Sequence, residues 1–233
     1  MSYLNFDFAT VAYTASTWIL PVLIAITFHE AAHGFVAWQL GDDSAYRQGR
    51  VTFNPLRHVD KWGTIIVPVL LLLSPAPFVF GWAKPVPVAF HRLRRPRSGM
   101  VKVAIAGPAI NLILAFLSAL LIGVASLFPA TLETWLTLNL AHSVLINLLL
   151  AVFNMLPLPP LDGGRVAVGL LPKFLALPLA RLERYGLFII IGGVFLLPML
   201  GDQIGVNLNV FYWLIWQPVE ALLPFFWALG GLG

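Results

Sequence analysis

The sequence has no cysteine and very little charge. Lys, Arg, Asp and Glu together make up 10% of the 233 residues, whereas about 25% is usual for a soluble domain, and hydrophobic residues make up 59%. This composition excludes an ordinary water-soluble globule. The absence of cysteine excludes disulfides and thiolate metal sites.

Long polar segments are also missing, because no stretch between the apolar runs exceeds about 25 residues. Six apolar stretches stand out, and a helix needs roughly 20 such residues to cross a bilayer. They cover about residues 13–40, 63–81, 101–128, 135–158, 186–200 and 207–230. The sequence therefore predicts an all-α polytopic membrane protein, in which residues 1–233 form a single integral-membrane domain.

Positive charge is absent from the N-terminal segment up to Arg47 and from the turns near Glu133 and Asp202. All 14 Lys and Arg residues lie in the segments 41–62, 82–102 and 159–185. Because basic loops stay in the cytoplasm, we expect a multi-pass protein of the bacterial inner membrane with its N-terminus outside. By the same rule, the excess of Lys and Arg serves to orient the protein in the membrane, so no nucleic-acid partner is expected.

The stretch 63–81 lies between two basic loops, so a full crossing would place one of them outside. Pro68, Pro75 and Pro77 make it the least helix-like of the six runs, which favours a re-entrant or proline-broken segment. A proline-kinked spanning helix is the alternative. The resulting prediction is about five transmembrane helices plus this segment, with short extended strands at 50–53 and 84–90 suggested by their β-branched residues and prolines.

The first apolar stretch contains the motif His29-Glu30-Ala31-Ala32-His33. A spacing of four residues puts both imidazoles on one helix face, where they can reach a single zinc ion, and Glu30 can act as general base. Ionisable groups in hydrocarbon are costly unless they are paired or coordinated, which favours a functional site over a buried polar cluster that helps helices associate.

A catalytic zinc site needs a third protein ligand, and Asp162 is the candidate. It follows Pro157, Pro159 and Pro160 and precedes two glycines, at the end of the fourth apolar stretch. The alternative for this Asp-Gly-Gly sequence is a simple turn. Asp162 reaches the metal only if the first and fourth stretches run in the same direction, which again requires 63–81 not to span the membrane.

These motifs resemble the site-2 protease family of intramembrane zinc metalloproteases, in a compact bacterial form without a PDZ domain. The resemblance rests on the HExxH helix, on Asn154-x-x-Pro157 leading to Leu161-Asp162-Gly163, and on Gly107-Pro108-Ala109-Ile110-Asn111. It implies a cofactor of one Zn²⁺ bound by His29, His33 and Asp162, and a water molecule activated by Glu30. It further implies that Asn154 and Pro157, together with Asn111, lie around the substrate or support the site.

The resemblance also implies the reaction, which is hydrolysis of peptide bonds in or near transmembrane segments of other membrane proteins. The catalytic core is expected at about residues 13–170, with accessory helices at about 186–230 and the active site toward the cytoplasm. Because the chain has no room for a PDZ domain, a separate regulatory protein is a possible further partner. The alternative is a catalytically inactive homologue that acts as a membrane scaffold or metal-binding protein.

An extended substrate could be held by pairing with an exposed backbone edge, and residues 50–53 or 84–90 are candidates for that edge. Replacing Val86 and Val88 with proline should then lower turnover without changing zinc content.

Overall fold

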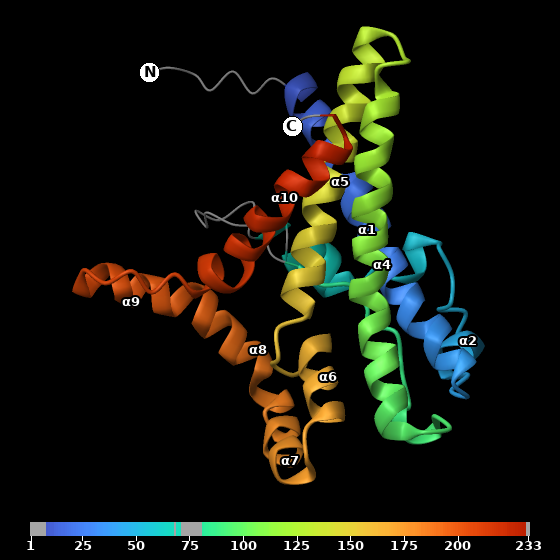
Figure 1. Ribbon diagram of the computed structural model, residues 1–233, viewed down its shortest axis with the longest axis vertical. Coiled ribbons are helices and arrows are strands. Elements are labelled where there is room, and N and C mark those ends of the chain that lie inside the picture. The colour runs from blue at the N-terminus through green and yellow to red at the C-terminus, as the bar shows by residue number, and fades with distance from the viewer. Residues whose placement is uncertain (1–7, 68, 71–80, 232–233) are drawn as a thin grey trace. The chain divides into compact units, whose positions relative to one another are not determined.

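The structure is a computed structural model that describes residues 8–67, 69–70 and 81–231, and within these ranges the chain is helical and has no β-strand (Figure 1). The predicted all-α class is confirmed. The long helices are α1 (Phe8–Gln39), α4 (Pro96–Ala125) and α5 (Ala130–Asn154). The shorter α-helices are α2 (Ser44–Arg47), α6 (Asp162–Leu170), α7 (Lys173–Arg181), α8 (Glu183–Ile191), α9 (Leu197–Ile204) and α10 (Gln217–Leu229). The described chain also contains two 3-10 segments, η1 (Pro55–Arg57) and η3 (Phe90–Arg92). It contains three π-helical segments as well, η2 (Lys61–Ile66), η4 (Gly192–Leu196) and η5 (Tyr212–Trp216).

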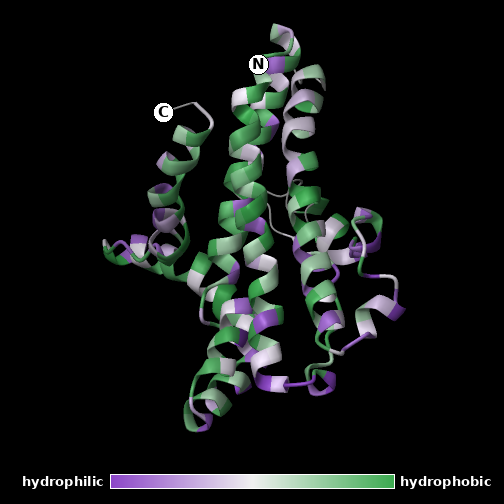
Figure 2. Cartoon of the chain, turned by 45° about the vertical axis from the view of Figure 1, so that its right-hand side comes forward, coloured by the Kyte–Doolittle hydropathy of each residue, from purple (hydrophilic) through white to green (hydrophobic). Residues whose placement is uncertain are grey.

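Four helical segments in the described ranges are long and apolar enough to cross a membrane. They are Ala9–Gln39, Pro96–Ala125, Ala130–Asn154 and Glu183–Ile204. Figure 2 shows that hydrophobic residues dominate the long helices. These segments match four of the six predicted apolar stretches, and the protein is therefore an α-helical membrane protein.

The other two stretches have different outcomes. Residues 207–230 contain η5 and α10, so this part is helical from Tyr212 to Leu229, but it is not among the four segments above. The stretch 63–81 begins within η2, where the Asp60 side chain accepts hydrogen bonds from the N–H groups of Trp62 and Gly63. Residues 68 and 71–80 lie outside the described residues, so re-entry at 63–81 stays a prediction.

The strands predicted at 50–53 and 84–90 are not found in the described chain. Residues 51–53 form a bend, and residues 81–89 have no regular secondary structure. Pro85 and Pro87 lack the N–H groups that a ladder needs, and side chains take up several of the neighbouring backbone groups. The segment is therefore positioned by side chains and by single backbone bonds such as that from Lys84 N–H to His58 O, and not by a partner strand.

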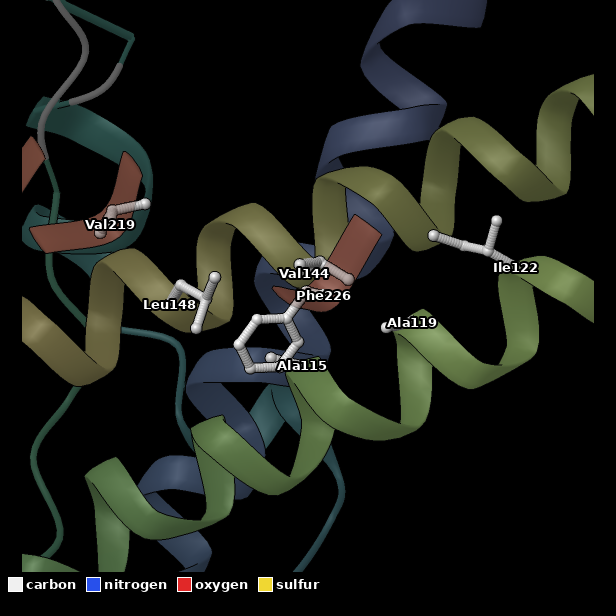
Figure 3. Packing of buried hydrophobic residues seen from close by; sticks show 7 residues of the cluster. All are labelled: Ala115, Ala119, Ile122, Val144, Leu148, Val219 and Phe226. Atoms are coloured by element: carbon white, nitrogen blue, oxygen red, sulfur yellow. The ribbon is translucent and has the colours of Figure 1, made fainter. Parts of the chain in front are cut away.

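The described chain packs as two compact units. The first consists of the residues up to Ala25, Asn111–Phe153 and the residues from Ile189 onward. Figure 3 shows its apolar core, to which α4, α5 and α10 contribute Ala115, Ala119, Ile122, Val144, Leu148, Val219 and Phe226. Alanine on α4 lets the neighbouring helices approach closely, a common device of membrane helix packing.

Polar side chains also join the helices of this first unit. Asn111 on α4 donates to Asn147 Oδ1 on α5 at 2.7 Å and to the carbonyl of Ala25 on α1 at 3.3 Å. Ser118 and Ser143 are hydrogen-bonded across the same two helices at 2.7 Å. Such bonds satisfy groups that would otherwise be unpaired in hydrocarbon.

The second unit comprises Ile26–Ile110 and Asn154–Phe188. It contains the C-terminal part of α1, the N-terminal part of α4 and the helices α6 and α7. Ala37, Leu93 and Val103 form a small buried cluster within it. Every residue of the predicted metal site lies in this unit.

Candidate metal centre

Three side chains that are far apart in the sequence converge in the second unit. His29 and His33 occupy successive turns of α1, and their Nε2 atoms are 3.0 Å apart. The Oδ2 atom of Asp162 lies 3.2 Å from each of these nitrogens. All three side chains are buried, and among the described residues they are the group that could hold a metal ion. The structure thus brings together the three residues that the sequence singled out.

The spacing of the three donor atoms fits a tetrahedral cation. Metal–ligand distances of about 2.0–2.1 Å at tetrahedral angles place neighbouring ligand atoms roughly 3.3 Å apart, close to the 3.0–3.2 Å observed. Asp162 Oδ2 is buried and makes no hydrogen bond with acceptable geometry to the described residues. A buried carboxylate oxygen of this kind needs a partner, and a metal ion would supply it.

The ionisation state of Asp162 also suits a ligand. Burial alone would raise the pKa of its carboxyl group, but the adjacent imidazoles of His29 and His33 outweigh burial and hold that pKa below its ordinary range. The group is therefore a carboxylate at neutral pH. A divalent ion would add to this effect, because it favours the ionised form still more strongly.

The orientation of His33 is fixed by the backbone of α4. Its Nδ1 atom lies 2.7 Å from the carbonyl oxygen of Val103, which can only accept, so Nδ1 carries the proton and Nε2 keeps its lone pair for a metal. A β-carbon at Gly107 would come within 2.5 Å of His29 Cε1 and His33 Nε2. Only glycine therefore allows α4 to lie this close to both imidazoles.

Asp162 is placed by close packing of the chain around it. It is the first residue of α6, although three prolines precede it closely and two glycines follow it. The following glycines do not have positive φ angles. Instead, a β-carbon at Gly163 would lie 2.2 Å from Met155 O, and one at Gly164 would lie 2.1 Å from Pro159 N. Both glycines let the preceding loop fold back tightly onto the helix.

Glu30, the predicted general base, is half-buried one residue after His29. Its Oε2 atom accepts a hydrogen bond of 2.7 Å from the backbone N–H of Val86. This contact joins the HExxH helix to the irregular segment 81–89. No local sequence signal predicts it, because 56 residues separate the two partners.

The remaining predicted site residues occupy separate places. Asn154 is the last residue of α5 and is half-buried, and Pro157 is exposed in the loop that leads to Asp162. Asn111 belongs to the first unit, where it is fully buried and bonded to Asn147. The roles of these three residues in substrate binding or support stay predictions.

Comparison with known proteins identifies relatives that are named as zinc metalloproteases. Over 185 residues the chain is 38% identical to YwhC of Bacillus subtilis (strain 168), which is named as a zinc metalloprotease, and the match covers 78% of this chain and 80% of that protein. The chain belongs to this family of zinc metalloproteases. Another relative named in the same way, Rip2 of Mycolicibacterium smegmatis, is 31% identical over 172 residues, which are 72% of this chain and 62% of that protein. MJ0611 of Methanocaldococcus jannaschii is 33% identical over 150 residues, covering 64% of this chain and 67% of that protein. No family model and no solved structure matches the chain.

Membership in this metalloprotease family makes the protein a hydrolase of peptide bonds with zinc as its cofactor. The nitrogen and oxygen atoms of His29, His33 and Asp162 are suitable zinc donors, and these residues would hold the ion. Zinc supplies Lewis acidity, which makes water a nucleophile near neutral pH.

Proposed function

We propose that this metalloprotease is an intramembrane endopeptidase of the site-2 protease type, which cleaves membrane proteins in or near their transmembrane segments. The observation that carries this proposal is the position of His29, Glu30 and His33 in α1. That helix provides a span of 31 residues, which is long enough to cross a bilayer and contains an 18-residue window with a mean hydropathy of 1.7. A catalytic centre on such a helix meets its substrates within or beside the membrane.

The proposed topology follows from charge. Residues 41–62, 82–102 and 159–185 hold all the basic residues and would face the cytoplasm, with the N-terminus outside the cell membrane. Asp162 lies in the third of these segments and is brought to His29 and His33. The active site would therefore open toward the cytoplasmic side, where water reaches it. We further propose one multi-pass catalytic domain, with accessory helices after about residue 186.

The chemistry assigned to the chain uses Glu30. Its carboxylate would take a proton from the attacking water and pass it to the leaving amine of the cleaved peptide. The burial of His29, His33 and Asp162 keeps bulk water away from these side chains, which strengthens electrostatic interactions among them. Val86 N–H, bonded to Glu30 Oε2, holds this base in place.

The function is tested by cleavage in a bilayer. The purified full-length chain in proteoliposomes is expected to cut a single-span model substrate, to lose this activity with a chelator, and to regain it when zinc is added. An unfolded soluble protein serves as the comparison substrate. Cleavage of the soluble protein alone would contradict the intramembrane assignment, and failure to cleave either substrate would favour a scaffold or metal-binding role.

Substrate binding would use the irregular segment before η3. A helical substrate must unwind before its carbonyls can be attacked, and pairing with an extended backbone stabilises the unwound form. In the described chain, Val88 makes no backbone hydrogen bond to another residue, whereas Val86 N–H is already bonded to Glu30. Val88 therefore offers free backbone groups two residues from the contact with the base.

Replacing Val88 with proline tests this binding mode. The substitution removes one N–H donor, and turnover of the membrane substrate is expected to fall about tenfold, with zinc content unchanged. Val88→Ala keeps the N–H group and is the matched control. Equal turnover of the proline and alanine variants would rule out backbone pairing at this position. Val86→Pro is a poorer probe of pairing, because it also breaks the contact with Glu30.

A further inference from the structure

Charged side chains fasten the segment 84–89 near both of its ends. Arg50 Nη2 donates to the carbonyl of Lys84 at 2.6 Å and to that of Pro85 at 3.3 Å. At the other end, Asp42 Oδ2 accepts a hydrogen bond of 2.6 Å from the N–H of Ala89. Between these two attachments, Val86 N–H meets Glu30. The residue that touches the base thus directly follows the two carbonyls held by Arg50.

Arg50 is an unusual residue to find inside this unit. Its side chain and backbone together are only 6% exposed, and among the described residues no carboxylate lies within ion-pair distance of its guanidinium. Its Nε atom is buried and has no hydrogen-bond partner among the described residues. Burying a cation in this way costs free energy that the two carbonyls offset only in part. We therefore expect the buried Arg50 to have a role other than stabilising the fold.

Arg50 is also linked electrostatically to the site. Burial lowers the pKa of its guanidinium, while the negative charge of Glu30 acts in the opposite direction. The guanidinium stays charged at neutral pH, because an arginine side chain loses its proton only in strongly basic solution. Arg50 therefore lies close enough to Glu30 to sense its carboxylate, without forming an ion pair with it.

We propose that Arg50 is a positioning residue of the catalytic site: it fixes the carbonyls of Lys84 and Pro85 and so directs Val86 N–H at Glu30. This inference rests on the proposed role of Glu30 as general base. A planar guanidinium has several donors in a fixed geometry, whereas the ammonium of lysine is a compact, flexible donor. Lysine at position 50 would keep the charge but hold the segment less well.

The inference is tested by a double-variant cycle on turnover of the membrane substrate. Arg50→Ala and Val86→Pro are each expected to lower kcat by about 10²-fold with little change in KM, because misplacement of a catalytic group by about 1 Å has an effect of that size. Since both act on one contact, the combined variant should be no slower than the slower single variant. Combined losses that multiply to about 10⁴-fold, or wild-type kcat in Arg50→Ala, would overturn the proposal.

A matched control separates positioning from general damage. Arg47→Ala removes an exposed arginine of α2 that is bonded to Asp43. It is expected to retain kcat. Arg50→Lys should fall between wild type and Arg50→Ala, and it keeps the test usable if the alanine variant does not fold.

Hydrogen exchange gives a readout that does not depend on activity. Residues 84–88 contain two prolines, so Lys84, Val86 and Val88 provide their only amide hydrogens. Lys84 N–H bonds to the carbonyl of His58 and Val86 N–H to Glu30, so both should be protected in the wild type and lose protection in Arg50→Lys. Unchanged protection would overturn the inference. If Arg50→Lys loses protection but the wild type cleaves no substrate, the positioning role of Arg50 stands and the proposed function is wrong.

Discussion

Glu30→Gln is expected to abolish most peptide hydrolysis while leaving zinc in place. Removing a general base typically costs roughly 10²–10⁴-fold in rate. Glutamine keeps a carbonyl oxygen that can accept the N–H of Val86, so the contact with the segment 81–89 should survive. The three donor atoms of the metal site are unchanged by this substitution.

The measurement is turnover of the membrane substrate together with the zinc content of the purified variant. Loss of turnover at full zinc content would agree with a base that does not bind the metal. Turnover equal to the wild type would defeat the assignment of Glu30. Loss of zinc along with turnover would show that Glu30 supports the metal site and would leave its role as base unsupported.

Asp162→Asn is expected to lose both zinc and activity. The amide has nearly the same shape as the carboxylate but no charge, and an uncharged oxygen is a weaker ligand for a divalent ion. Removing a residue that hydrogen-bonds a metal ligand lowers metal affinity by about 10–100-fold. Removing the charge of a ligand itself should therefore lower zinc affinity at least about 100-fold. Elemental analysis after dialysis against a weak chelator measures the change.

Asp202→Asn is the matched control, because this exposed aspartate lies on α9 in the other unit. It should bind one zinc per chain, like the wild type. Stoichiometric zinc in Asp162→Asn would show that the approach of Asp162 to His29 and His33 does not reflect metal binding. Zinc content distinguishes the two variants. Glu30→Gln should lose activity and keep zinc, whereas Asp162→Asn should lose both.

The metal site could be predicted from the sequence because its main signals are local. The spacing of four residues between His29 and His33 fixes their common face on any α-helix. Asp162 is predicted by a different argument, from the need for a third ligand and from its place between prolines and glycines at the end of the fourth apolar stretch. The structure brings all three together, and the relatives named as zinc metalloproteases agree with zinc as the cofactor.

Contacts between distant segments could not be predicted in the same way. The strands expected at 84–90 are not found because prolines and side-chain contacts replace ladder hydrogen bonds, and β-branched composition does not reveal such partners. The sequence alone also does not distinguish why glycines follow Asp162, because close packing and a positive φ angle both favour glycine. Arg50 carried no signal beyond its positive charge, because its burial depends on where the segment 84–89 folds.

Gly107 also limits which inhibitors can reach the metal. The α4 backbone at this residue occupies the space beside the imidazoles of His29 and His33, so a hydroxamate or other chelating group has no route from that side. We expect such a compound to approach from the side of Glu30, which contacts the segment 81–89. Selectivity among enzymes that share the HExxH motif would then come from the part of the drug that lies along this segment.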